Sequence, residues 1–352
     1  MTPARRRAFR LLALLGGTCL GLLGAEGIAR LVIPAEALQV VENIFARDPD
    51  PELGYRFRRD YRAIAFGVPL ATNSRGFRGP EWSQAPARAR RVLLVGDSNA
   101  FGYGVPFEDT VGEELARELS ARTGTPHEVL NLAVNGYTTR QQLRLLRAEG
   151  FALQPERVVV IVTENDHEPP LIVDEAGWLH WIEFSPETRV GDASAARLAP
   201  SPGWVWATRH SRLAFWLQLT LARRALTEAH AQRPPLRSGQ PGAWMQGAVA
   251  PGSISPIVSE GVASPLRELV QECQSRGVQV IVATLAAGPD YRRTVVALER
   301  EGVPCLELFG LFPEVGSEEE LTAQFGLGWD VHFNAVAHAR WARGIADLLE
   351  PR

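Results

Sequence analysis

A serine at the end of an apolar run is the first residue of the chain that could do chemistry. The segment "RVLLVGDSNAFGYG" (91–104) reads as a buried strand that ends in an acid, a serine and small residues, and a helical pattern follows it. Such an end is either an ordinary turn or a place where a substrate meets a nucleophile. Ligands of open α/β sheets bind beyond the carboxyl ends of the strands. We therefore predict that Ser98 is a nucleophile.

A serine hydroxyl attacks a carbonyl only when a base takes its proton and an acid orients that base. Near the C-terminus, "WDVHFNAVAHARW" places Asp330 two positions before His332, just ahead of the last helical pattern. This spacing in a loop lets the acid contact the imidazole, so we predict Asp330 and His332 as catalytic. His338 is the rival base, but it falls inside the helical pattern, where a packed or surface residue is expected. His167, beside Asp166, is a further candidate for mutation.

Acyl transfer also needs hydrogen-bond donors where the carbonyl oxygen becomes negative. Two other strand ends offer them. Gly136 in "VLNLAVNGYTTRQQL" has a backbone N–H with no side chain in the way, and Asn165 in "VVVIVTENDHEPP" has a side-chain amide. Each residue taken singly could be a turn residue. Together with Ser98 and His332 they all follow predicted strand ends, so we expect them on one rim of a sheet.

The elements that must position these residues alternate between strands and helices from residue 91 onward. Continuous apolar runs without polar alternation suit a parallel sheet that is covered on both faces. The predicted strands are 92–95, 129–133, 158–162, 278–284 and 304–309, and the predicted helices are 110–122, 138–149, 264–275, 290–301 and 334–349. The pattern predicts an α/β fold, a three-layer α/β/α sandwich with a five-stranded, mostly parallel sheet and right-handed crossovers.

Composition excludes several other classes of protein. The chain has 352 residues, 45% of them apolar and 22% charged, which is ordinary globular usage. A net charge of −3 with short, scattered basic runs argues against nucleic-acid binding. The cysteines form no C-x-x-C pair, and neither H-E-x-x-H nor clustered ligands occur, so we expect no metal. Phe107 occupies the third glycine position of a G-x-G-x-x-G loop, so we expect no dinucleotide and no other cofactor.

The N-terminus predicts a membrane anchor. Four arginines precede the uncharged run "LLALLGGTCLGLLGA" (11–25), which keeps the N-terminus cytoplasmic and sends the rest across the membrane. That run alone spans about 22 Å, less than the roughly 30 Å of a bilayer core, and would suit a cleaved signal. The apolar pattern resumes in "GIARLVIP", where Glu26 and Arg30 can pair. We favour an uncleaved anchor over residues 1–34, with secretion after cleavage as the alternative.

Two further regions lack the alternation of strands and helices. The first, residues 35–89, is expected to be an extended juxtamembrane segment, in which "TNSRGFRG" (72–79) forms a tight surface turn. The second is an insertion at about 167–262 within the α/β domain of residues 90–352, and it contains a helix around 211–229. The insertion carries six of the nine tryptophans, which either pack it onto the domain or form a lid or carbohydrate-stacking surface.

Four blocks of the sequence resemble those of a known family. "VGDSNAFGYG", "NLAVNGYTTRQQ", "VTENDH" and "DVHFNAVAH" are similar, in order, to the four blocks of the SGNH or GDSL hydrolases. The resemblance implies a flavodoxin-like fold, Ser98 as nucleophile, His332 as base and Asp330 as its orienter. It also implies an oxyanion hole made of the Ser98 backbone N–H, Gly136 and Asn165. The turn sequence after a single anchor looks like that of membrane-tethered bacterial members, whose domain is periplasmic.

The chain departs from the family pattern at two positions. Thr163 stands where the third block, G-x-N-D, has glycine, which alters the loop without removing the Asn165 donor. One residue rather than two separates Asp330 from His332, a spacing that related polysaccharide acetyltransferases also show. The second departure leaves the reaction class open more than it affects the triad.

Three functional hypotheses follow. The first is a serine esterase at the cell membrane that hydrolyses O-acyl esters, O-acetyl esters among them, through an acyl-enzyme on Ser98. The second is an O-acyltransferase that acts on a cell-surface glycan. The third is an inactive SGNH-like module that binds glycans. The expected partners are an acylated small molecule or glycan and, through the N-terminal helix, the membrane.

Overall fold

The computed structural model describes residues 3–32, 44–66, 68–82, 89–173, 179–180, 207, 211–214, 217, 253–286, 288–327 and 332–351. The chain divides into two compact units. One combines Met1–Val40 with Ala193–Pro235, and the other combines Val41–Asp192 with Leu236–Arg352. The second unit contains every predicted strand.

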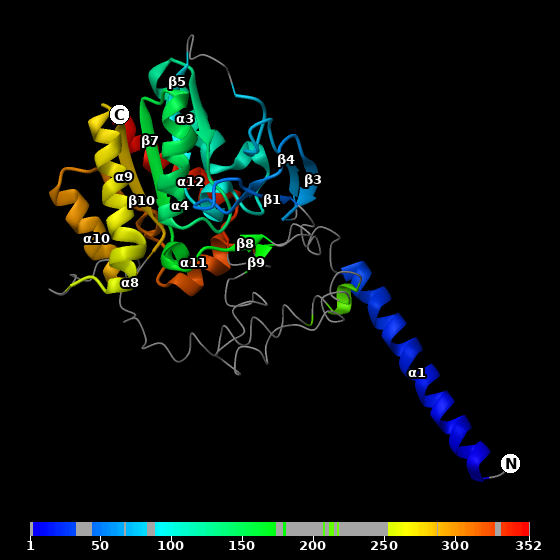
Figure 1. Ribbon diagram of the computed structural model, residues 1–352. Coiled ribbons are helices and arrows are strands. Elements are labelled where there is room, and N and C mark those ends of the chain that lie inside the picture. Colours follow the sequence, from blue (N-terminus) through cyan, green and yellow to red (C-terminus); the bar gives the residue numbers. More distant parts are fainter. Residues whose placement is uncertain are drawn as a thin grey trace. The chain divides into compact units, whose positions relative to one another are not determined.

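A five-stranded sheet forms the centre of the second unit (Figure 1). Its strands lie in the order β11-β10-β7-β5-β6, and all neighbours are parallel. The bounds are β5 (Arg90–Val95), β6 (His127–Asn131), β7 (Arg157–Val162), β10 (Gln279–Thr284) and β11 (Cys305–Glu307). Every residue of β7 is buried, as expected for a strand covered on both faces. The predicted sheet is confirmed.

Helices cover both faces of this sheet. The bounds are α3 (Val111–Thr123), α4 (Thr139–Leu145), α9 (Ser264–Ser275), α10 (Pro289–Arg300) and α12 (Ala335–Leu349). Helix α3 packs against α12, and α4 packs against α9. With right-handed crossovers, this strand order puts α3 and α12 on one face and α4, α9 and α10 on the other. The three-layer α/β/α sandwich predicted from the sequence is therefore the observed fold.

Two elements differ from the predicted ones. The helix expected over 138–149 leaves α geometry after Leu145 and continues as a π-helical turn over Leu146–Gly150. Helix α11 (Glu318–Phe325) was not expected. It begins at Ser317, whose side chain accepts a hydrogen bond from the Glu320 N–H, and it precedes the segment that carries His332.

Residues 44–66 and 68–82, in the segment expected to be extended, form two short hairpins and a turn. Strand β1 (Phe45–Arg47) pairs with β2 (Tyr55–Phe57), and β3 (Arg62–Ala65) pairs with β4 (Val68–Ala71). Phe57 stacks on Phe101 with 4.7 Å between ring centroids, so these hairpins share the core of the sheet. Strands of three or four residues are too short to show a periodic pattern, which is why the sequence suggested only an extended segment.

The "TNSRGFRG" stretch does form a turn, in which Ser74 and Arg75 are exposed and the side chains on either side of them are buried. The Gly76 N–H donates to the Asn73 carbonyl at 2.9 Å, and Thr72 and Arg78 form an antiparallel bridge. Both Asn73 and Arg78 are buried. The tip of this turn therefore lies at the surface, as expected, while the residues that flank the tip are buried.

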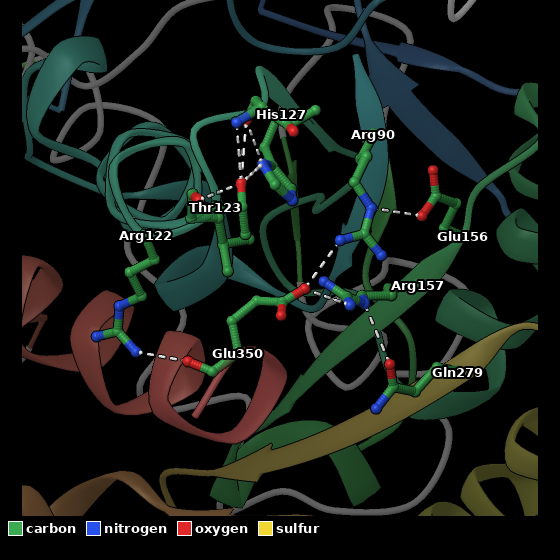
Figure 2. Close-up of polar contacts among 10 residues, drawn as sticks. Arg90, Arg122, Thr123, His127, Glu156, Arg157, Gln279 and Glu350 are labelled. Atoms are coloured by element: carbon green, nitrogen blue, oxygen red, sulfur yellow. Dashed lines mark hydrogen bonds and ion pairs between the residues drawn. The ribbon is translucent and has the colours of Figure 1, made fainter. Parts of the chain in front are cut away.

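Charged residues hold the C-terminal helix to the amino edge of the sheet (Figure 2). The Glu350 carboxylate, just beyond α12, pairs with Arg90 at 2.9 Å and Arg157 at 2.6 Å. Arg157 also donates to the Gln279 side chain at 3.1 Å. Glu350 therefore ties the end of α12 to the first residues of β5 and β7, at the edge opposite to Ser98.

The first unit contains the N-terminal helix α1 (Pro3–Val32). Its residues Arg5–Val32 are long and apolar enough to cross a membrane, a test that a signal sequence would also meet. The expected pair of Glu26 and Arg30 is present at 2.7 Å. Glu26 also accepts a hydrogen bond from the Ser211 hydroxyl at 2.7 Å, so the start of the segment at 211–214 contacts this helix.

Little of the insertion falls within the described residues. These include a short hairpin of β8 (Ile172–Val173) with β9 (Leu179–His180), and the helix α8 (Pro256–Val258). Most of the helix predicted around 211–229 and all six tryptophans of the insertion lie outside them. The two hypotheses for this tryptophan-rich segment stay predictions.

Candidate active site

Ser98 is the first residue of a short helix that starts directly beyond β5. Helix α2 (Ser98–Phe101) is capped by Asp97, whose Oδ1 accepts a hydrogen bond from the Asn99 N–H at 3.0 Å. A Cβ on Gly96 would lie 2.9 Å from the Ile161 carbonyl oxygen of β7, so only glycine allows this close approach. The Gly-Asp-Ser sequence thus makes a tight turn that places Ser98 at the carboxyl edge of the sheet.

His332 lies against Ser98, as predicted. Its Nε2 is 2.7 Å from the Ser98 Oγ, although the two residues are 234 positions apart in the chain. The backbone carbonyl of His332 accepts a hydrogen bond from the Leu327 N–H at 2.9 Å. The imidazole stacks on the Tyr103 ring, with centroids 4.1 Å apart and planes inclined by 19°. The contact from Nε2 suits a base that receives the serine proton.

Asp330, the predicted orienter of His332, lies outside the described residues. Its role stays a prediction. The rival bases are placed elsewhere. His338 is buried, its Nδ1 accepts a hydrogen bond from the Val111 N–H at 3.1 Å, and burial lowers its pKa to about 3. His167 contacts the Tyr291 hydroxyl at 2.8 Å. The expectation of a packed His338 is therefore met.

Gly136 follows β6 in a conformation that favours glycine. Its φ is 76°, and an added Cβ would lie 2.4 Å from the Leu171 Cδ1 and 3.0 Å from the Tyr55 hydroxyl. That hydroxyl donates to the Asn135 carbonyl at 2.8 Å, so the N-terminal hairpins brace this turn. Among the described residues, neither the Gly136 N–H nor the Ser98 N–H has a hydrogen-bond acceptor. Both donors are available to a ligand.

Asn165 lies in the short 3₁₀ helix Glu164–His167 that follows β7. Its Oδ1 accepts a hydrogen bond from the Thr163 hydroxyl at 2.8 Å. The same hydroxyl lies 2.9 Å from Asp97, which links the turn of Asn165 to that of Ser98. Strands β6, β5 and β7 are neighbours in the sheet, so the three predicted oxyanion residues follow adjacent strand ends. This is the rim that the sequence predicts.

Two buried acids lie beneath this rim. Asp97 and Asp166 are both fully buried. Asp166 accepts hydrogen bonds from the Thr139 hydroxyl and the Gln142 amide, each at 3.1 Å. Burial, and then the charge of Asp97, raise the pKa of Asp166 well above its usual range.

Two residues that support the site escaped sequence reasoning. Tyr103, in the "FGYG" that follows Ser98, stacks on His332. The Arg78 guanidinium donates to the carbonyls of Phe101, Gly102 and Val105, at 3.1, 2.6 and 2.5 Å, and so holds the loop that carries Tyr103. The glycines beside Tyr103 marked a loop, but nothing in the local pattern shows what the ring or the guanidinium would contact. Within the described residues, no cluster of three or more histidine, cysteine or acidic side chains could hold a metal ion.

Comparison with known proteins finds similarity at the level of solved structures only. No family model matches the chain, and no curated protein matches it. A lipolytic protein of the G-D-S-L family from Desulfitobacterium hafniense DCB-2 is 11% identical, with 73% of this chain and 98% of that chain covered and a TM-score of 0.39. The psychrotrophic esterase EstA from Pseudoalteromonas sp. is 11% identical over 74% of this chain and 97% of its own, with a TM-score of 0.40. An acetylxylan esterase from Geobacillus stearothermophilus is 14% identical over 75% and 96%, also with a TM-score of 0.40. The chain is thus similar in structure, at low identity, to GDSL-type lipolytic proteins and esterases.

Proposed function

We propose that the protein is a serine esterase of the SGNH type that hydrolyses O-acyl esters. The observation that carries this proposal is the 2.7 Å contact between the Ser98 Oγ and the His332 Nε2 at the carboxyl edge of the sheet. Packing alone does not require a serine at a strand end to hydrogen-bond an imidazole. The same pair is the minimal equipment for nucleophilic attack on a carbonyl.

The reaction follows from this geometry. The Ser98 Oγ attacks the acyl carbonyl while His332 accepts the hydroxyl proton. The carbonyl oxygen becomes negative and receives hydrogen bonds from the Ser98 and Gly136 N–H groups and from the Asn165 amide. His332 then gives its proton to the leaving alkoxide, which leaves an acyl group on Ser98. Water then attacks the acyl-enzyme while His332 accepts one of its protons, and His332 returns that proton to the Ser98 oxygen as the acid is released.

Labelling of the full-length protein in detergent with a fluorophosphonate probe tests this proposal. We expect the parent to be labelled, and labelling to be lost in Ser98→Ala and strongly reduced in His332→Ala. Ser275→Ala is the matched control, because Ser275 is an exposed serine at the end of α9. Labelling of Ser98→Ala at the parent rate would overturn the proposal.

The pH dependence of ester hydrolysis checks the base. A protonated imidazole cannot accept the serine proton, so the rate should fall as the pH is lowered. A rate that does not fall at acidic pH, in a protein that stays folded there, would reject His332 as the base.

Transfer of the acyl group to a sugar is the second candidate. The short spacing of Asp330 and His332 favours it, since related polysaccharide acetyltransferases resemble the chain there. Incubation with an activated ester and sugar acceptors decides between the two reactions, because transfer gives an acylated sugar and hydrolysis gives only the free acid. In either case we propose that α1 anchors the enzyme in the cell membrane with its catalytic domain outside the cytoplasm.

A further inference from the structure

The Tyr103 ring lies between two other aromatic rings. On one side it stacks on the His332 imidazole, with 4.1 Å between the centroids and planes inclined by 19°. The Phe66 ring lies 4.2 Å from Tyr103, with planes inclined by 35°. At these distances each ring lies over a face of Tyr103, and one face is too small for two rings. Phe66, Tyr103 and His332 therefore form a column of three rings that ends at the imidazole beside Ser98.

Phe66 occupies a position in which phenylalanine is unusual. Ala65 of β3 pairs with Val68 of β4, so two residues connect these strands. Two-residue connections favour asparagine, aspartate or glycine, because these residues accept a positive φ. The φ of Phe66 is 55°, a conformation that bulky residues keep only where their surroundings compensate for it. The geometry of the turn therefore does not explain a phenylalanine here.

The contacts of the Phe66 ring supply that compensation. Besides its contact with Tyr103, the ring meets the Phe101 ring edge-on, with 6.0 Å between the centroids and planes inclined by 87°. Phe101 is buried and stacks in turn on Phe57 of β2. Aromatic pairs in both arrangements are favourable beyond the area that they bury. Phe66 is thus anchored to the core on one side and applied to Tyr103 on the other.

The backbone beside Tyr103 is held by other groups. The Tyr103 N–H donates to the Ser98 carbonyl at 3.0 Å. The buried guanidinium of Arg78 donates to carbonyls on either side of Tyr103. These hydrogen bonds fix where the loop lies, whereas the direction of a side chain depends on its own rotamer and contacts. Phe66 covers the face of the Tyr103 ring that is turned away from His332.

We propose that Phe66 is a positioning residue, which holds the Tyr103 ring against His332 and so keeps the imidazole in place for the Ser98 hydroxyl. This inference rests on the proposed function, because it takes His332 as the base. The imidazole reaches the Ser98 Oγ at 2.7 Å, and a ring that is free to turn would keep this geometry for less of the time. The hairpin of β3 and β4, which precedes the α/β domain in the chain, thereby becomes part of the active site.

Substitutions at Phe66 test this role in the full-length protein in detergent, with p-nitrophenyl acetate as substrate. Phe66→Leu stays apolar but loses the ring, so kcat should fall by roughly 2- to 10-fold, the effect of one aromatic pair, with little change in KM. Phe66→Tyr keeps the ring and should recover most of the parent kcat. Phe151→Leu is the matched control, because Phe151 is another partly buried phenylalanine, in the 3₁₀ helix Phe151–Leu153. A parent-like kcat in Phe66→Leu, or an equal loss in Phe151→Leu, would overturn the inference.

A double-mutant cycle tests whether Phe66 acts through Tyr103. Once Tyr103 is replaced by leucine, Phe66 has no ring left to hold. We therefore expect Phe66→Leu to lower kcat in the parent but to leave it nearly unchanged when it is added to Tyr103→Leu. Independent effects would multiply instead. A double variant whose loss equals the product of the two single losses would contradict the inference.

The placement of the imidazole has a readout that needs no activity. A proton over the face of an aromatic ring resonates upfield, so Tyr103 should shift the carbon-bound protons of the His332 imidazole upfield. In NMR spectra of the full-length protein with isotope-labelled histidine, His332→Ala identifies these signals. At alkaline pH, where imidazoles are neutral, they should move downfield in Tyr103→Leu and Phe66→Leu and stay near the parent position in Phe66→Tyr. Unmoved signals in Phe66→Leu would overturn the inference.

The outcomes separate the inference from the proposed function. If labelling depends on Ser98 but Phe66→Leu keeps the parent kcat and the parent His332 signals, the inference fails and the esterase stands. If Ser98→Ala keeps full labelling, the proposed function fails, while the His332 signals still show whether Phe66 holds the column of rings.

Discussion

The charged side chains at the two edges of the central sheet have different kinds of partner. At the amino edge, Glu350 forms ion pairs with Arg90 and Arg157 (Figure 2). These pairs are partly open to solvent, since 27% of the Glu350 side chain is exposed. At the carboxyl edge, Asp97 and Asp166 are fully buried, and neither forms a salt bridge within the described residues. Charges at the amino edge cancel against opposite charges. Those at the carboxyl edge accept hydrogen bonds from neighbouring hydroxyl, amide and backbone groups.

This difference distinguishes polar residues that stabilise the fold from polar residues that could take part in a reaction. An open hollow lies at the amino edge, lined by residues that include Arg90, Arg122, Thr125 and Glu350. Its arginines and acids already pair with one another. The carboxyl edge instead offers N–H donors without acceptors among the described residues and a serine in contact with a histidine. The presence of a hollow is therefore a poorer guide to function here than the unused hydrogen-bonding capacity of the rim.

The largest effect at the carboxyl edge is expected from Gly136→Ala. The added Cβ would lie 2.4 Å from Leu171 in a backbone conformation with a φ of 76°, so the turn that presents the N–H must move. Loss of one oxyanion donor predicts a fall in kcat of about 100-fold or more, measured by ester hydrolysis.

Gly124→Ala is the control for that substitution. Gly124 also has a positive φ, of 66°, but nothing lies within 4 Å of an added Cβ. It should lower stability by about 1–2 kcal/mol and leave kcat unchanged. Equal kcat values for Gly136→Ala and Gly124→Ala would contradict the proposed difference between the two edges.

A smaller effect is expected from Tyr103→Leu. The variant loses the ring that stacks on His332 at 4.1 Å. Aromatic pairs contribute about 0.5–1.5 kcal/mol, which corresponds to a kcat lower by roughly 2- to 10-fold. Tyr103→Phe keeps the ring and should retain more of the parent kcat than Tyr103→Leu in the same assay. If Tyr103→Phe loses as much activity as Tyr103→Leu, the hydroxyl and not the stack is what matters.

The smallest effect is expected at the amino edge, from Glu350→Gln. The neutral side chain loses its ion pairs with Arg90 and Arg157. We expect a loss of about 1 kcal/mol in the free energy of unfolding, measured with urea, and no change in kcat. Glu299→Gln, an exposed acid in α10, is the control and should not change stability. A fall in kcat for Glu350→Gln with parent-like stability would show that the amino edge takes part in the chemistry.

Much of the fold was predictable because it depends on local patterns. The apolar runs of β5, β7 and β10 are continuous, and the helices between them repeat apolar residues at helical spacing, so both signals lie within a few neighbouring residues. The hairpins at residues 45–71 were missed because their strands have only three or four residues. Helix α11 was missed because only Leu321 of its residues is buried, which leaves little apolar pattern to read.

The sequence by itself determined the order of the five strands of the central sheet and of the helices between them, and the types of residue at the strand ends. Ser98, Gly136, Asn165 and His332 were all predicted as site residues in this way, and Thr163 was noticed only as a departure from a pattern. Tertiary structure alone decided that the Thr163 hydroxyl meets two buried acids, that Tyr103 stacks on His332 and that Arg78 holds the Tyr103 loop. The physical reason is that element type follows from the periodicity of neighbouring residues, whereas contacts between segments far apart in the chain depend on how the layers pack.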